Sequence, residues 1–204
     1  MIKNIISDIG NVILEFNPEI IVLKYTDDMK RAQEIASVLF KGEEWYKWDR
    51  DLITKSEIAK SVKSKLRKSE FHIIDKILNT WWGYMVFNEE LLDFYEVQKS
   101  KGMKLYLLSN YSPDYYELKW DKERKSLFEG EIISCDFKVG KPDPEIYKLL
   151  LDKFELEASE CLFIDDLEQN LQTAKELGFN TLRYHLKERS MDEFIADFND
   201  IVEV

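Results

Sequence analysis

A chain of 204 residues is long enough for one large domain, or for a core with a modest insertion, and it can bury a substantial hydrophobic core. Its apolar residues (45%) and aromatic residues (13%) are typical of a folded globular protein and exclude a disordered chain. There are 40 acidic against 29 basic residues, and the net charge of −11 argues against nucleic acid or an anionic membrane as a main partner, because phosphate groups would be repelled.

Several features predict a cytoplasmic protein, either a monomer or a homodimer. The chain does not begin with a basic segment followed by an apolar stretch and a cleavage site, and it has no apolar run long enough to span a bilayer. Cys135 and Cys161 fall in apolar runs that we interpret as strands. Buried reduced thiols are therefore favoured over a disulfide or a metal site.

The first predicted element is a short buried strand, Lys3–Ser7, which ends at Asp8. Pro18 then indicates a helix start, and from there to about residue 85 only helices are predicted. Their cores are expected at Asp28–Phe40, Ser56–Arg67 and Ser69–Trp82, the second introduced by the capping-box pattern Thr54-Lys55-Ser56-Glu57. Residues 16–85 are thus predicted to be an all-helical cap inserted after the first strand.

The remainder of the chain alternates between strands and helices. Strands are predicted at Met103–Leu108, Ile132–Cys135, Cys161–Ile164 and Thr181–Tyr184, with helices between them. Strands separated by helices predict a parallel sheet with helices on both faces. The fold class is therefore α/β, a doubly wound parallel sheet, with residues 1–15 and 86–204 forming the core.

Polar residues follow the predicted strands, where a parallel sheet binds its ligands. Asp165 and Asp166 repel each other unless a cation or a proton intervenes, and with Asp8 they form a hard oxygen site suited to Mg²⁺. Lys141 and Ser109 add a positive charge and a hydroxyl, which would hold a phosphoryl group while a carboxylate attacks it. For Lys141 alone, a solvated surface lysine is an equally good interpretation.

These stretches together resemble the four motifs of the haloacid dehalogenase (HAD) superfamily, and the resemblance spans essentially the whole chain. The motifs are Asp8-Ile9-Gly10-Asn11-Val12, Ser109, Lys141 in Gly-Lys-Pro-Asp-Pro-Glu-Ile-Tyr, and Phe163-Ile164-Asp165-Asp166 with Asn170. The resemblance implies a Rossmann-like core with a small helical cap. Within the superfamily the chain is most similar to bacterial α-glucose-1-phosphate phosphatases, which share the Asp-x-Gly-Asn-Val start and the double Asp.

The resemblance also implies a role for each matching residue. Asp8 would be the nucleophile that forms an aspartyl-phosphate, and it would ligate Mg²⁺ together with the carbonyl of Gly10 and with Asp166. Asp165 would act through the water shell of the metal or would orient Lys141.

The phosphate-binding roles come from the same comparison. Ser109 and the main chain of Asn110 would hold phosphate oxygens, and Lys141 would balance their charge. Trp45 and Trp48 in the predicted cap are candidates for stacking on a sugar, although packing of the cap against the core is about an equal alternative.

The chain departs from the family pattern at Gly10. Phosphatases of this family usually have a second Asp there, which acts as general acid and base, and its loss could cost on the order of 10²–10⁴ in rate. A sugar anomeric hydroxyl tolerates that loss because it leaves more easily than an ordinary alcohol. Other cap side chains are possible substitutes, although each is more easily interpreted as a surface or capping residue: Glu43, Glu44, Asp49 and His72.

The sequence therefore predicts an Mg²⁺-dependent phosphomonoesterase acting on a small phosphorylated metabolite, such as the sugar phosphate glucose 1-phosphate. A 2-haloacid dehalogenase-type hydrolase is a second interpretation, disfavoured by Asp165-Asp166 because that chemistry uses no metal. A third is a non-catalytic phospho-ligand-binding regulatory protein.

Overall fold

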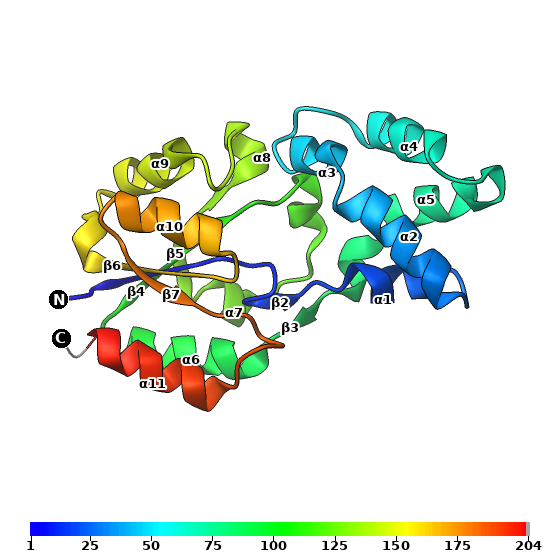
Figure 1. Ribbon diagram of the computed structural model, residues 1–204. Helices are drawn as coiled ribbons and strands as arrows, with labels where there is room; N and C mark the ends of the chain where they lie inside the picture. Colours follow the sequence, from blue (N-terminus) through cyan, green and yellow to red (C-terminus); the bar gives the residue numbers. More distant parts are fainter. Residues whose placement is uncertain (203–204) are drawn as a thin grey trace.

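The computed structural model describes residues 1–202, and its centre is a five-stranded parallel sheet (Figure 1). The strand order is β5-β4-β1-β6-β7, with every neighbouring pair parallel. The strands are β1 (Asn4–Ser7), β4 (Lys104–Ser109), β5 (Phe128–Ile133), β6 (Cys161–Asp165) and β7 (Asn180–Arg183). The predicted α/β class is confirmed.

Helices cover both faces of the sheet because successive strand residues point to opposite sides. Ile5 faces a layer that contains Tyr95 of α6 (Glu89–Ser100) and Phe194 of α11 (Met191–Val202). Ile6 faces the other layer, formed by α9 (Pro144–Phe154) and α10 (Glu168–Glu176). Figure 1 shows the two helix pairs on either side of the sheet. Both faces of β1 are therefore buried, which makes it the most rigid position for a functional residue.

The segment between β1 and β4 is largely helical, and we call residues 18–84 the helical insert. Figure 1 shows it to one side, beyond the carboxyl end of β1. Thr54 and Glu57 form the predicted capping box at the start of α4. The insert contains α1 (Pro18–Leu23), α2 (Met29–Phe40), α3 (Glu43–Trp48), α4 (Lys55–Ser64) and α5 (Phe71–Leu78), with 3₁₀ turns at Lys68–Glu70 (η1) and Trp81–Tyr84 (η2).

A short antiparallel sheet joins the two ends of the insert. It pairs β2 (Leu14–Glu15) with β3 (Val86–Phe87). The sequence did not predict these strands, because two residues are too few to show an alternating pattern. They lie where the predicted boundary falls, and the division into a core of residues 1–15 and 86–204 and a cap of residues 16–85 stays a prediction.

The predicted strand Ile132–Cys135 is wrong at its carboxyl end. β5 stops at Ile133, and Cys135 lies in α8 (Ser134–Phe137), because the Ser134 side chain turns back to bond the Tyr111 backbone. The helix expected after Ser112 is a 3₁₀ turn, η3 (Pro113–Glu117), and the remaining short elements are α7 (Lys122–Lys125) and η4 (Ala158–Glu160).

Among residues 1–202 no helix combines the length and apolar character that a membrane crossing requires.

Candidate active site

Asp8 is held rigidly at the carboxyl end of the central strand. Its backbone N–H donates to the carbonyl of Ile164 at 2.9 Å, which extends the β1–β6 pairing by one residue. Its carbonyl accepts from the Ser7 hydroxyl at 2.8 Å, and that hydroxyl accepts from Tyr95 at 2.9 Å. The Asp8 side chain therefore has a fixed origin in the sheet, and the residue is only 7% exposed.

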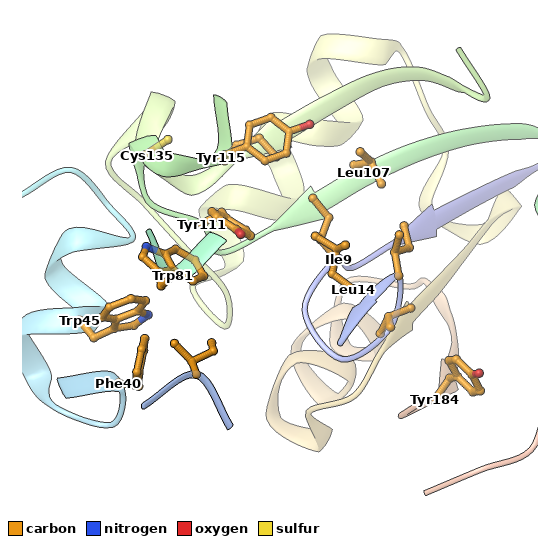
Figure 2. Packing of buried hydrophobic residues seen from close by; sticks show 14 of the residues in the cluster. Ile9, Leu14, Phe40, Trp45, Trp81, Leu107, Tyr111, Tyr115, Cys135 and Tyr184 are labelled. Carbon is orange, nitrogen blue, oxygen red and sulfur yellow. The ribbon is translucent and has the colours of Figure 1, made fainter. Parts of the chain in front are cut away.

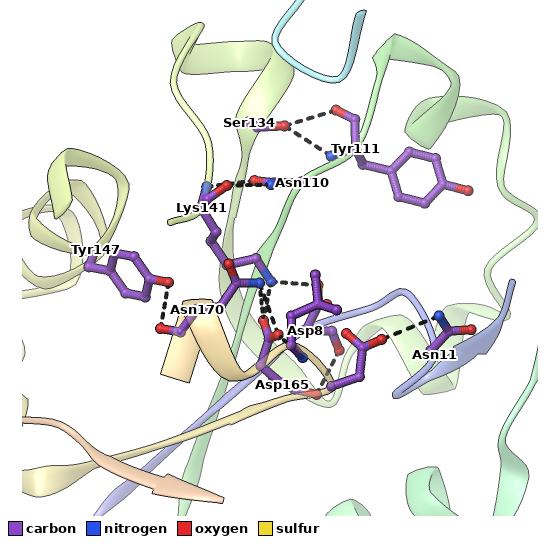
Figure 3. A network of polar contacts seen from close by, with 12 residues as sticks. Asp8, Asn11, Asn110, Tyr111, Ser134, Lys141, Tyr147, Asp165 and Asn170 are labelled. Atoms are coloured by element: carbon purple, nitrogen blue, oxygen red, sulfur yellow. Dashed lines mark hydrogen bonds and ion pairs between the residues drawn. The ribbon is translucent and has the colours of Figure 1, made fainter. Parts of the chain in front are cut away.

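Lys141 reaches the same point from the loop before α9. Its ammonium lies 2.8 Å from Asp8 Oδ1 and 2.6 Å from Asp165 Oδ2, and the residue is 2% exposed. Figure 3 shows the lysine between the two carboxylates. Burial by itself would lower the pKa of Lys141, but the charges of Asp165 and Asp8 outweigh it and raise the pKa above its usual value. Lys141 is thus a fixed cation beside Asp8.

The backbone of Lys141 is clamped by the side chain of Asn110. The Lys141 N–H donates to Asn110 Oδ1 at 2.7 Å, and Asn110 Nδ2 donates to the Lys141 carbonyl at 2.8 Å. A Cβ atom at Gly140 would come within 2.7 Å of Asn110 Oδ1 and 3.1 Å of Arg50 Nε. Gly140 therefore permits the close approach that the clamp needs. The sequence predicted a phosphate-binding main chain at Asn110 but missed this positioning role of its side chain.

Three buried carboxylates form the other half of the site. One oxygen each from Asp8, Asp165 and Asp166 lies within 4.8 Å of the others. Burial, together with the neighbouring charge of Asp8, raises the pKa of both Asp165 and Asp166, and only partial relief comes from Lys141. A divalent cation would remove this repulsion, and an all-oxygen donor set is the kind that Mg²⁺ prefers. The residues present therefore fit a magnesium ion.

Two asparagines orient these carboxylates, and neither was assigned a role from the sequence. Asn170 Nδ2 lies 2.9 and 3.1 Å from the two oxygens of Asp165. Asn11, in a left-handed turn with φ 55°, donates to Asp166 Oδ2 at 3.3 Å. Both could have been found from the sequence, because Asn11 closely follows Asp8, and Asn170 follows Asp166 in the first turn of α10.

The predicted site residues fall into two groups. Asp8, Lys141, Asp165 and Asp166 meet as described, while Gly10 lies two residues past Asp8 and Ser109 is buried at the carboxyl end of β4 beside β1. The other group is a pair of tryptophans in the helical insert.

Trp45 and Trp48 lie in a buried aromatic cluster. Figure 2 shows Trp45 beside Phe40 and Trp81. The ring centroid of Trp45 is 4.5 Å from that of Phe40, 5.2 Å from that of Trp81 and 4.9 Å from that of Trp48. These contacts are packing within the insert, and both packing of the tryptophans against the core and a role in substrate binding stay predictions.

A family model described as haloacid dehalogenase-like hydrolase matches residues 2–178. The chain belongs to this family. The hydrolase is 28% identical over 209 aligned positions to D-ribitol-5-phosphate phosphatase of Bacteroides thetaiotaomicron, covering 90% of this chain and 92% of the relative. It is 25% identical over 158 residues to flavin mononucleotide hydrolase 1 of Arabidopsis thaliana and 32% identical over 116 residues to bifunctional epoxide hydrolase 2 of Sus scrofa. These matches cover 77% and 54% of the hydrolase but only 61% and 20% of the two relatives, which is less than two thirds of either.

Solved structures resemble the hydrolase along most of its length. A HAD family enzyme from Bacteroides thetaiotaomicron, in complex with magnesium and inorganic phosphate, matches with a TM-score of 0.67 and 23% identity, over 95% of this chain and 100% of that chain. A dehalogenase matches with a TM-score of 0.72 and 18% identity, over 93% and 87%. At these identities the likeness establishes the fold alone, and the HAD-like Rossmann core is confirmed.

Proposed function

We propose that this hydrolase is an Mg²⁺-dependent phosphomonoesterase that acts on a small phosphorylated metabolite through an aspartyl-phosphate. The observation that carries the proposal is Lys141, buried between Asp8 and Asp165 beside a third carboxylate. Lys141, together with a bound Mg²⁺, would supply the positive charge that an anionic phosphoryl group needs in order to approach the negatively charged Asp8.

Each residue has a defined part in the proposed reaction. A phosphate monoester would bind with its oxygens toward the Lys141 ammonium, the Ser109 hydroxyl and the backbone N–H of Asn110. Asp8 would attack the phosphorus atom in line, and water would then hydrolyse the aspartyl-phosphate. Mg²⁺, held by Asp8, Asp166 and the Gly10 carbonyl, would supply positive charge to the phosphoryl oxygens. Asp165 would hold Lys141 in place.

The substrate class follows from Gly10 and from the relatives. Without an acid at position 10, a sugar phosphate with a good leaving group, such as glucose 1-phosphate, is the substrate that makes the smallest demand for a proton from elsewhere in the site. The relatives named as phosphatases of D-ribitol 5-phosphate and of flavin mononucleotide support a phosphate ester of a small metabolite. Two buried, unpaired thiols, Cys135 and Cys161, are consistent with work in the cytoplasm.

A dehalogenase function is the second candidate because one relative, (S)-2-haloacid dehalogenase 4A of Burkholderia cepacia, is 23% identical over 174 residues. The three-carboxylate cluster argues against it, because a carbon–halogen hydrolase has no use for a metal site. A regulatory protein that only binds a phospho-ligand is the third candidate.

One assay separates the three functions. We expect wild-type protein to release phosphate from p-nitrophenyl phosphate in an EDTA-sensitive way, and Asp8→Asn to lower that rate by at least about 10³-fold. Asp75→Asn, at an exposed carboxylate of α5, is the matched control and should leave the rate unchanged. Halide release from 2-chloropropionate without metal would support the dehalogenase instead. Stabilisation by phosphate without any turnover would support the regulatory protein.

A further inference from the structure

Asp49, the half-buried residue that follows α3, lies where the helical insert meets the core. The Asp49 carbonyl accepts a hydrogen bond from the Ser134 hydroxyl, and that hydroxyl accepts from the Tyr111 N–H at 2.9 Å. Figure 3 shows Ser134 and Tyr111 above the Lys141 clamp. Asp49 is therefore fastened to Ser134 at the start of α8, and through Ser134 to Tyr111 in the loop that follows β4.

The next residue fastens the same segment to the lysine loop. Arg50 Nη2 lies 3.5 Å from the carbonyl of Gly140 and 3.4 Å from that of Lys141. The segment at Asp49 and Arg50 thus contacts both loops that surround Asp8, at the carboxyl end of the sheet. No other part of the insert is fixed to the two loops in this way among the contacts of residues 1–202.

We propose that Asp49 is the general acid and base of the phosphoryl transfer, in place of the carboxylate that related phosphatases have at position 10. This assignment rests on the proposed function and deepens it. In this role Asp49 would face the leaving group, whereas Asp8, Asp165 and Asp166 form the carboxylate cluster beside Lys141.

The surroundings of Asp49 suit proton transfer near neutral pH. Burial is the main cause that raises its pKa to about 7, and the nearby negative charge of Asp8 raises it further. The positive charge of Arg50 and the backbone N–H of Ser112 act in the opposite direction. Tyr111, in the loop after β4, also faces Asp49. Burial is the main cause that raises the pKa of the Tyr111 phenol, and the negative charge of Asp49 raises it further. A carboxyl group that is part protonated at pH 7 can both donate and accept a proton.

The space beside Gly10 is not filled by another part of the protein. A Cβ atom at Gly10 would meet no heavy atom within 4 Å. Next to Asp49, the buried hydroxyls of Tyr111 and Ser112 have no hydrogen-bond partner among residues 1–202. Those two hydroxyls would suit the polar atoms of a hydroxyl-bearing leaving group.

The other candidate acids of the insert are occupied or exposed. Glu44 accepts from the Ser61 hydroxyl and pairs with Lys65, and these contacts lower its pKa to about 2, so it stays ionised. Glu43 is exposed and pairs with Lys47 at 2.6 Å along α3. His72 is exposed on α5.

The proposed proton transfers balance over one turnover. An Asp8 oxygen forms a bond to phosphorus as the ester P–O bond breaks, and the leaving oxygen takes the proton of Asp49 to become an alcohol. The Asp49 carboxylate then removes a proton from water, whose oxygen bonds to phosphorus as the P–O bond to Asp8 breaks. Phosphate leaves, Asp8 is regenerated, and Asp49 is protonated again.

The test compares a good and a poor leaving group on the full chain with Mg²⁺. We expect Asp49→Asn to lower kcat/KM for glycerol 3-phosphate by about 10²–10⁴-fold but for p-nitrophenyl phosphate by less than about tenfold. In wild type, kcat/KM for glycerol 3-phosphate should fall as pH rises through about 7, because the protonated acid is lost, and Asp49→Asn should lose that limb. Asp51→Asn, at an exposed position with φ 49° that Asn tolerates, is the matched control.

A second variant tests the role by rescue. The double variant Gly10→Asp with Asp49→Asn should hydrolyse glycerol 3-phosphate at least about tenfold faster than Asp49→Asn alone, because position 10 has room for the side chain. An equal loss on both substrates, or no loss on either, would overturn the role of Asp49. A failure of the proposed function would look different. If the wild type hydrolyses p-nitrophenyl phosphate and Asp8→Asn does not, the proposed function stands, whatever the result for Asp49.

Discussion

At the scale of single residues, the site is a problem of charge. Asp8, Asp165 and Asp166 contribute three negative charges when ionised and Lys141 contributes one positive charge, which leaves two negative charges in a buried space. Uncompensated buried charge is costly, which is why the pKa of Asp165 and of Asp166 is raised. A divalent cation would supply the two missing positive charges.

This charge balance predicts how Mg²⁺ affects stability. Because the folded-state pKa of Asp165 and of Asp166 is raised, the metal-free protein gains stability from them at low pH and loses it as pH rises through the folded pKa. Mg²⁺ competes with those protons, so it should raise Tm more at pH 8 than at pH 5.5. Asp166→Asn should remove most of the shift in a calorimetric melt, and Glu168→Gln, at the exposed first residue of α10, should keep it. An equal Mg²⁺ effect in both variants would place the metal elsewhere.

At the scale of elements, the sequence predicted what local patterns encode. The capping box at Thr54 and Glu57 marked α4, and the apolar runs marked β1, β4 and β6 together with the polar residues at their ends. Strands β2 and β3 were missed because each has two residues and is defined only by a partner that lies far away in the sequence, Leu14 opposite Phe87 and Glu15 opposite Val86.

The site was predicted in the same uneven way. Asp8, Lys141, Asp165 and Asp166 could be found because each follows a strand or a turn that the sequence marks. The clamp from Asn110 to Lys141 and the approach of Asp49 depend on how distant loops pack. No local pattern encodes such packing, and the sequence could name Asp49 only as one of several candidates.

The lysine loop gives a prediction at this scale. Gly140→Ala would place a Cβ 2.7 Å from Asn110 Oδ1, and because Asn110 is bonded at both ends to Lys141 it cannot move without moving the lysine backbone. We expect a loss of about tenfold or more in kcat and a destabilisation of about 1–3 kcal/mol in a denaturant titration. Gly83→Ala, where a Cβ meets no heavy atom within 4 Å, is the control. Wild-type kcat in Gly140→Ala would show that the clamp is not required.

At the scale of the whole molecule, the helical insert lies against the core and covers the site. Asp114, buried in the loop after β4, pairs with Lys55 of α4 at 2.5 Å and accepts from Trp81 Nε1 at 2.8 Å. Trp81 in turn stacks on Tyr111 with ring centroids 5.3 Å apart. These contacts tie the insert to the segment that follows β4.

Asp114 should therefore control how firmly the insert is docked. Asp114→Ala leaves the buried Trp81 N–H without an acceptor and Lys55 without its partner, at a cost of about 1–3 kcal/mol. Asp75→Ala removes the partner of Lys63, also at 2.5 Å and from the same helix, but on the exposed surface, where the cost is about 0–1 kcal/mol. In the first variant, hydrogen exchange should speed up in α3 and α4 while β6 stays protected. The change in KM, expressed as a free energy, should exceed the change in the free energy of unfolding of the core. If the two variants exchange alike, Asp114 does not hold the insert in place, and docking depends on the aromatic cluster instead.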